Sequence, residues 1–221
     1  MKISDNTRSI FKNFSTINSG IRVKAGDKLE TISNMKNILA IANIEESFPQ
    51  DFSIYNLPEF LGATSLMEDP EFQFGDVSLT VADEHSSLAY FYASEGMVTA
   101  PDKMITMPES EIEFNVSSQL LSDLNKAASV LGVNDLILDS DGTKVTLTVK
   151  DKKNPTSNQF SRIVGEGDGS TYTMNFKIEN LKILEGNYSV SVSSKGISHF
   201  QNKDIDLEYF IALEPDSKFG A

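Results

Sequence analysis

The sequence of 221 residues contains neither cysteine nor tryptophan. Without cysteine, a disulfide framework and any Cys-ligated zinc or iron–sulfur site are excluded. No apolar run approaches the roughly 20 residues that cross a bilayer. The opening residues, MKISDNTRSIFKNF, lack the uninterrupted apolar stretch of a signal peptide. We therefore expect an intracellular protein with no membrane segment.

Histidine is scarce. His85 and His199 are both predicted to lie in loops, and neither has a second metal ligand nearby. The glycine-rich residues 165–170, GEGDGS, lack the lysine of a P-loop and carry two acids that would repel phosphate. The turn DSDG at 139–142 is too short a ligand series for an EF-hand. We predict no catalytic residues, no metal and no cofactor, although the many carboxylates leave an acid pair open.

Positive charge is in deficit, with 19 Lys and Arg against 32 Asp and Glu and a net charge of −13. Taken over the whole chain, this balance disfavours nucleic acid as a partner, because phosphate binding needs Lys and Arg. The N-terminal segment is the exception: residues 1–24 contain one acid, Asp5, and five basic residues, namely Lys2, Arg8, Lys12, Arg22 and Lys24. This basic opening is either a solvated helix face or a binding surface.

An internal repeat runs through the chain. FSIYNLPEFLG at 52–62 returns as FKIENLKILEG at 176–186, and LAYFYA at 88–93 returns as LEYFIA at 207–212. With the pair of amphipathic helices and the pair of hairpins described below, these make four correspondences in the same order, which predict two similar domains: 1–108, which includes an extended connector at 94–108, and 109–221. Each half is predicted to contain a helix, a β-hairpin, a short helix and further strands, which places the chain in the α+β class. The predicted hairpins cover 19–32 and 131–149, and the predicted short helices cover 56–67 and 179–186.

The two predicted longer helices are amphipathic. In the first, Ile10, Phe14 and Ile17 share one face, and Arg8 and Lys12 fall on the opposite face. The second helix repeats this apolar spacing with Leu120, Leu121, Leu124 and Ala127, and Lys126 lies on its polar flank. Ser4 and Ser117 are the predicted N-caps.

The features that carry a resemblance to a known family are the internal repeat, the acidic body, FKNFSTINSGI at 11–21 and the ending LEYFIALEPDS at 207–217. In these features the chain resembles the DNA polymerase sliding clamps of T-even-type bacteriophages. The connector residues TMPESEIEF at 106–114 are also similar to cellular sliding clamps. The resemblance implies the DNA clamp fold, with helices on one face of antiparallel sheets, in a head-to-tail homotrimeric ring around duplex DNA. It implies a processivity factor that tethers the DNA polymerase, is opened by a clamp-loader complex, contacts late transcription factors and works in the cytoplasm of an infected bacterial host.

The resemblance also implies three sets of site residues. Those facing DNA would be Arg8, Lys12 and Lys126. Lys2 and Lys182 are weaker candidates, because each could equally be an ordinary solvated charge. A partner-peptide pocket would use Ile38, Met104, Ile105, Met107, Pro108, Phe210, Ile211, Leu213 and Pro215. The subunit interface would pair two strands through Leu88, Tyr90 and Tyr92 on one copy and Phe160, Arg162 and Val164 on the next.

Two alternatives stay open at this stage. One is a duplicated β-rich phage structural or assembly protein with no DNA role, which would have no reason to place Arg8 and Lys12 together on an outward helix face. The other is an enzyme with an acidic active site, which would need a cleft that the sequence does not locate.

Overall fold

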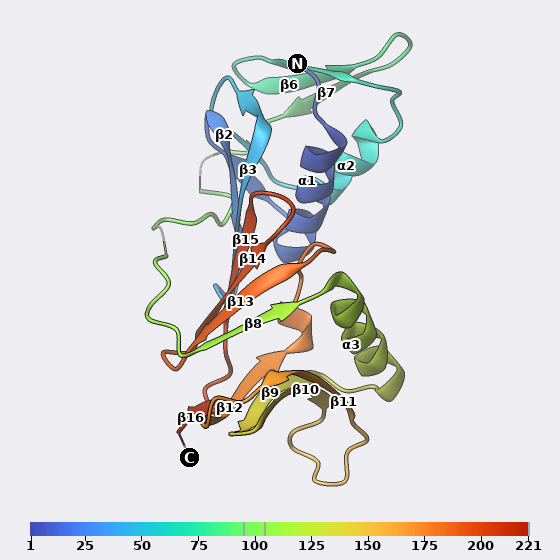
Figure 1. The fold of residues 1–221 in the computed structure, drawn as a ribbon. Coiled ribbons are helices and arrows are strands. Elements are labelled where there is room, and N and C mark those ends of the chain that lie inside the picture. Colours follow the sequence, from blue (N-terminus) through green and yellow to red (C-terminus); the bar gives the residue numbers. More distant parts are fainter. Residues whose placement is uncertain (95, 104, 221) are drawn as a thin grey trace. The chain divides into compact units, whose positions relative to one another are not determined.

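The structure is a computed structural model that describes residues 1–94, 96–103 and 105–220. The chain divides into two compact units, Met1–Met104 and Ile105–Ala221 (Figure 1). This division falls inside the predicted connector 94–108. None of the helices in the described residues is long and apolar enough to cross a membrane.

In its described residues the first unit consists of two helices and seven strands. In chain order these are α1 Asp5–Ile17, β1 Ile21–Val23, β2 Gly26–Ile32, β3 Ile38–Phe48, β4 Phe52–Ile54, α2 Leu57–Thr64, β5 Glu71–Phe74, β6 Ser78–Ala82 and β7 Ser87–Phe91.

Helix α1 forms as the sequence predicts. The Ser4 side chain accepts a hydrogen bond from the Thr7 backbone N–H and so caps the helix. Ile10, Phe14 and Ile17 are buried beneath it, where the helix packs on β2 and β3. The helix ends at Ile17, because the extended backbone of the C-cap residue Asn18 stops the α-helical ladder.

The predicted hairpin at 19–32 is wrong. β1 pairs with β4, with Ile21 opposite Ile54, while β2 pairs with β3. The turn between β1 and β2 is held to the loop before β4, because the Ala25 N–H donates to the Asp51 carboxylate at 2.7 Å. A third group of strands, β5-β6-β7, is antiparallel, with β7 at its edge.

The second unit consists of one long helix, one 3₁₀ turn and nine strands in its described residues. These are β8 Ile112–Val116, α3 Ser118–Leu131, β9 Asp135–Asp141, β10 Lys144–Lys150, β11 Phe160–Glu166, β12 Thr171–Lys177, η1 Ile178–Asn180, β13 Tyr188–Ser193, β14 Ile197–Asn202, β15 Leu207–Ala212 and β16 Lys218–Phe219.

Two antiparallel sheets make up this second unit. One has the order β11-β10-β9-β12-β16, and the strands β8, β13, β14 and β15 are neighbours in that order. The predicted hairpin at 131–149 is confirmed as β9 and β10, whose turn contains Gly142 at φ 89°. Helix α3 packs on β10 and β11 (Figure 1), and Ser117 caps it as predicted.

Helix α3 buries a slightly different set of residues from the predicted one. Leu121, Leu124 and Ala128 are buried, whereas Leu120 and Ala127 are half-buried. The buried set follows the 3, 4 spacing of one helix face.

The predicted short helices have different outcomes. Residues 56–67 contain α2, in which the Asn56 side chain accepts from the Glu59 N–H and Pro58 occupies the first turn. Residues 179–186 form no α-helix, and only the 3₁₀ turn η1 reaches into them. Asn180, the counterpart of Asn56, is buried inside that turn, whose N-cap residue is Lys177. The second half of the repeat has no proline at the position of Pro58, so nothing there fixes the backbone of a first helical turn.

Candidate nucleic-acid and partner interfaces

The outward face of α1 presents the two cations predicted to face DNA. Lys12 is exposed, and 41% of the Arg8 side chain is exposed, while Ile10 and Phe14 on the opposite face are buried. The Arg8 guanidinium lies 3.8 Å from the Asp5 carboxylate, one turn earlier. A pair at this distance on an exposed face contributes only about 0–1 kcal/mol, so Arg8 remains available to a phosphate.

A groove runs between α1 and α2, beside this cationic face. Arg8, Lys12 and Ser15 line it from α1, and Thr64 and Ser65 line its other side. Its apolar lining includes Phe11, Phe60 and Phe72. The groove therefore offers two cations and several hydroxyl groups above an apolar floor, which suits a phosphodiester backbone.

The N-terminus of α1 is fixed by Glu46 on β3. The Ser4 backbone N–H and the Thr7 hydroxyl both donate to the Glu46 carboxylate, the latter at 2.5 Å. Burial alone would raise the pKa of Glu46, but these hydrogen bonds lower it below its ordinary value. The ionised carboxylate also suits a helix N-terminus, and it sets the orientation of the face that presents Arg8 and Lys12.

The outward face of α3 is more weakly basic. Lys126 is its only Lys or Arg, and it is exposed. Asp123 lies one turn earlier and is engaged twice, by the Gln119 amide at 2.8 Å and by Arg162 on β11 at 3.8 Å. Part of the negative charge near Lys126 is therefore offset.

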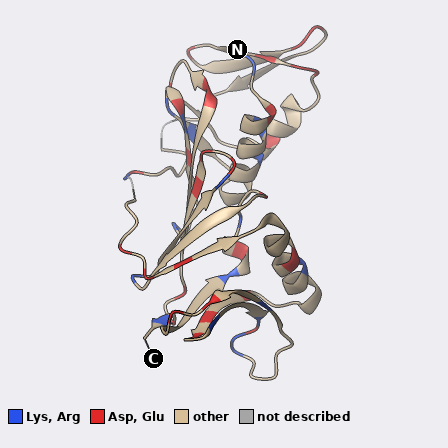
Figure 2. Ribbon diagram, viewed as in Figure 1, with Lys and Arg blue, Asp and Glu red and all other residues tan. Residues whose placement is uncertain are grey.

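Lys2 and Lys182 lie outside the two long helices. Lys2 precedes α1 and forms an ion pair with Asp69, which raises the pKa of the lysine. Lys182 follows η1 and is exposed. Figure 2 shows how the acidic and basic residues are distributed along both units.

Strand β7 forms an edge of its sheet and contains predicted interface residues. Leu88 and Tyr90 are half-buried, and the Tyr90 hydroxyl donates to the Asn56 carbonyl at 3.2 Å. Just past the strand, the Tyr92 ring packs against Phe52, and its buried hydroxyl has no partner among the described residues. The alternate face contains Phe91, which is 70% exposed.

Strand β11 is the edge of the five-stranded sheet. Its predicted interface residues have internal contacts, since Arg162 lies 4.6 Å from the Phe160 ring centroid and also reaches Asp123. Here too the largest apolar exposure is on the alternate face, where Ile163 is 63% exposed. Sequence reasoning missed Phe91 and Ile163, because alternation defines two faces without showing which one the chain itself covers.

The predicted partner-pocket residues come from both units and differ in exposure. The buried ones are Ile38, Phe210, Ile211 and Leu213. Phe210 stacks on the His199 ring at 4.5 Å. Met107 and Pro108 are half-buried, and Ile105 and Pro215 are exposed. Met104 lies outside the described residues.

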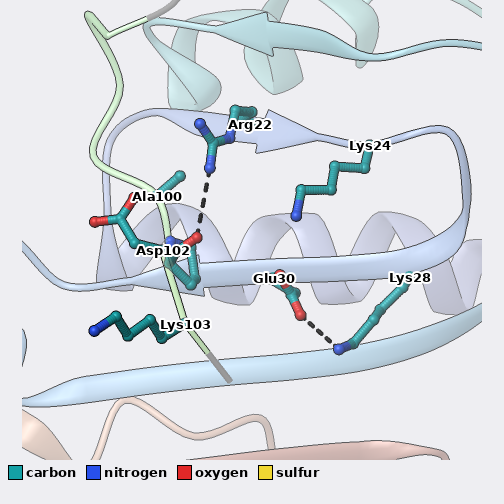
Figure 3. A pocket seen from close by; sticks show the side chains of 8 residues that line it. Arg22, Lys24, Lys28, Glu30, Ala100, Asp102 and Lys103 are labelled. Carbon is teal, nitrogen blue, oxygen red and sulfur yellow. Dashed lines mark hydrogen bonds and ion pairs between the residues drawn. The ribbon is translucent and has the colours of Figure 1, made fainter. Parts of the chain in front are cut away.

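A charged hollow at the connector was not predicted. Residues 100–103 of the connector lie beside β1 and β2, and four of the residues that line the hollow are cations (Figure 3). The Arg22 guanidinium donates to the Pro101 carbonyl at 3.4 Å, and Lys28 pairs with Glu30 at 2.5 Å. We call this hollow the connector cleft; its lining residues are Arg22, Lys24, Lys28, Glu30, Ala100, Pro101, Asp102 and Lys103.

The chemistry-bearing motifs have structural roles. His199 was predicted to lie in a loop, but it lies on β14, where it pairs with Glu208 at 2.7 Å. In GEGDGS, the Gly167 and Gly169 N–H groups donate to Thr143 and Gly142 across the β9–β10 turn. Among the described residues no cluster of His, Asp and Glu could hold a metal ion.

Comparison with known proteins identifies the family. Residues 4–100 match the model for DNA polymerase processivity factors, and residues 113–215 match the model for the C-terminal part of the gp45 sliding clamp. The sliding clamp of Vibrio phage KVP40 is 34% identical, over 97% of this chain and 99% of the relative. The sliding clamp of Enterobacteria phage T4 is 30% identical, over 98% of both chains.

The fold is also that of more distant clamps. The structure titled as the C-terminal region of FEN-1 bound to A. fulgidus PCNA superposes with a TM-score of 0.73 at 12% identity, covering 98% of each chain. Neither of the two alternatives raised from the sequence is supported by these matches. The chain belongs to the sliding-clamp family of T4-like bacteriophages, whose members are non-enzymatic DNA polymerase processivity factors.

Proposed function

We propose that this chain closes into a head-to-tail homotrimeric ring that encircles duplex DNA and tethers the replicative polymerase. The observation that carries the proposal is the outward face of α1, where Arg8 and Lys12 stand opposite a buried apolar stripe. Lys and Arg neutralise phosphates without reading bases, so such a face holds DNA and still permits sliding. The net charge of −13 keeps DNA off the rest of the surface.

The ring would be closed through the two edge strands. β7 and β11 are edges of their sheets, and each exposes a large apolar side chain, Phe91 and Ile163. Pairing β7 of one copy with β11 of the next would satisfy the edge backbone groups and cover both side chains. Head-to-tail contacts that close form rings, and the domains 1–108 and 109–221 of three chains would give six similar segments. Arg8, Lys12 and Lys126 would face the hole, with Lys2 and Lys182 nearer its rim.

The remaining partners would use the connector. We place there the docking of short apolar peptides from the DNA polymerase, from the clamp-loader complex that opens the ring, and from late transcription factors. Ile105, Met107 and Pro108 retain exposed or half-exposed surface for this purpose, and methionine adapts to several partners. These events would take place in the cytoplasm of the infected bacterial host.

The test is a charge reversal on α1. Arg8→Glu with Lys12→Glu is expected to weaken retention on nicked circular DNA and to lower the salt dependence of binding, because each lost phosphate contact reduces the slope by about 0.9. Gel filtration of clamp and DNA measures retention, and light scattering checks that the oligomer mass is unchanged. The matched control is Lys195→Glu with Lys203→Glu, which makes the same charge change on exposed residues of the second unit. Unchanged retention in the α1 variant, or equal loss in the control, would refute the assignment.

A further inference from the structure

The connector cleft lies on the face of β1 and β2 that is turned away from α1. Arg22 stands between Ile21 and Val23, which are each 1% exposed, and Lys28 and Glu30 flank the fully buried Leu29. Side chains alternate across a strand, so the charged residues project from the side opposite the core, and α1 packs on the core side.

The cleft has unused positive charge. Arg22 and Lys28 are engaged with the Pro101 carbonyl and the Glu30 carboxylate. Lys24 and Lys103 form no hydrogen bond or ion pair with any described residue, and both are exposed. Lys24 extends into the space above the Lys28–Glu30 pair (Figure 3). Four cations against two carboxylates give this hollow a net positive charge in a chain of net −13.

The backbone beside these lysines is fixed on one side. The Thr99 carbonyl accepts from the Asn18 amide at 2.9 Å, and the Arg22 bond holds Pro101. The start of the connector is thereby attached to the end of α1 and to β1. Ile105 follows shortly along the chain and is 38% exposed, so apolar surface comes after the basic cleft.

We propose that the connector cleft binds an acidic peptide segment of a partner protein, with Lys24 and Lys103 pairing its Asp or Glu carboxylates. This inference rests on the proposed function, in which partner peptides dock at the connector. It adds that such a peptide carries acidic residues beside its apolar ones, and that the cleft selects for them by charge complementarity.

The cleft is not a second contact for the encircled DNA. Its residues project from the side of β2 opposite α1, so a duplex lying along Arg8 and Lys12 cannot reach them. Glu30 and Asp102 would also repel the continuous charge of a phosphate backbone, whereas a peptide can place single carboxylates beside Lys24 and Lys103.

The test uses two labelled twelve-residue peptides that share an apolar half of Leu and Phe residues. The other half contains four Asp in one peptide and four Asn in the other. Fluorescence anisotropy with the full chain is expected to show about fivefold to tenfold tighter binding of the Asp peptide at low salt, since each exposed charge pair contributes modestly. The preference is expected to shrink as salt shortens the screening length.

Lys24→Gln with Lys103→Gln is expected to bring the two peptides to within about twofold of each other, with the oligomer mass unchanged because neither side chain has a partner. The control, Lys195→Gln with Lys203→Gln, removes two charges elsewhere and keeps the preference. Equal binding of the two peptides, no binding of either, or a preference that survives in the cleft variant overturns the proposal. Displacement of the Asp peptide by duplex DNA in the Arg8→Glu/Lys12→Glu background would instead assign the cleft to nucleic acid. Retention on circular DNA is read separately, so a failure here is distinct from a failure of the ring.

Discussion

Phe91 on β7 offers the sharpest test of the proposed ring closure. The side chain is 70% exposed at a sheet edge. An aromatic side chain has about 150–250 Å² to bury, so covering this one would remove on the order of 140 Å² from water. At about 25 cal/mol per Å², this burial would stabilise each proposed subunit contact by up to about 3.5 kcal/mol, or roughly 300-fold in the dissociation constant.

The substitution Phe91→Asp removes that contribution and adds a carboxylate that would be desolvated in the contact. We expect the assembly of three 24.3 kDa chains, about 73 kDa, to dissociate at concentrations where the unsubstituted chain is assembled. Light scattering over a dilution series measures the mass. Ile163→Asp on β11 is expected to have a similar effect, since that side chain is 63% exposed.

Met35→Asp is the matched control, because Met35 is 84% exposed in the turn between β2 and β3 and belongs to neither β7 nor β11. It is expected to leave the mass unchanged. All three variants should keep the thermal unfolding of the single chain, because none of these side chains is buried in it. If Phe91→Asp retains the trimer mass throughout the dilution series, or if Met35→Asp dissociates equally, β7 does not form the contact.

Two further predictions concern the turn between β9 and β10 and the glycine segment that crosses it. Gly167→Ala would place a Cβ 2.5 Å from the carbonyl of Gly142, a backbone clash that we expect to destabilise the fold by about 1–3 kcal/mol. Gly165→Ala meets nothing closer than 3.9 Å and is the control in denaturant unfolding; equal losses in the two variants would contradict this account. Hydrogen bonds from the Thr143 hydroxyl and from the Thr143 and Lys144 N–H groups lower the pKa of Asp141 to about 2. Because the folded pKa is depressed, this contribution to stability is fully present above the ordinary Asp value of about 3.9 and is lost as pH falls through 2. An NMR titration measures this pKa, and a Thr143→Val variant that left it near 2 would show that the hydroxyl is not the main cause.

Local patterns in the sequence predicted the two long helices well. Helices α1 and α3 and their caps Ser4 and Ser117 follow from apolar spacing and from side chains within one turn. The pairing of β1 with β4 could not be predicted in this way, because each strand has three residues and the partners are about thirty positions apart. The hairpin rule favours the nearer strand, and the Asp51 carboxylate that holds the β1–β2 turn beside the start of β4 lies in a loop.

In the candidate sites, too, local contacts could be predicted and distant ones could not. Arg8 and Lys12 lie one turn apart on one helix, so helical periodicity alone predicted that they share a face. In the connector cleft, Arg22 donates a hydrogen bond to Pro101, which is 79 positions later in the chain. No local sequence pattern indicates that contact. Phe91 and Ile163 lay on strands that were predicted, but which face of an edge strand stays uncovered depends on what packs against its sheet.

The later part of the connector lies between two hydrogen-bonded points. Arg22 holds Pro101, and the Ser193 hydroxyl donates to the Glu109 carbonyl at 2.7 Å. Between these points, described residues 102, 103 and 105–108 form no backbone hydrogen bond. Eight residues of fully stretched chain reach about 28 Å. The length of this segment therefore limits how far its two anchor points can separate when a mechanical force is applied to the chain. A larger force would act first on the hydrogen bonds of Arg22 and Ser193.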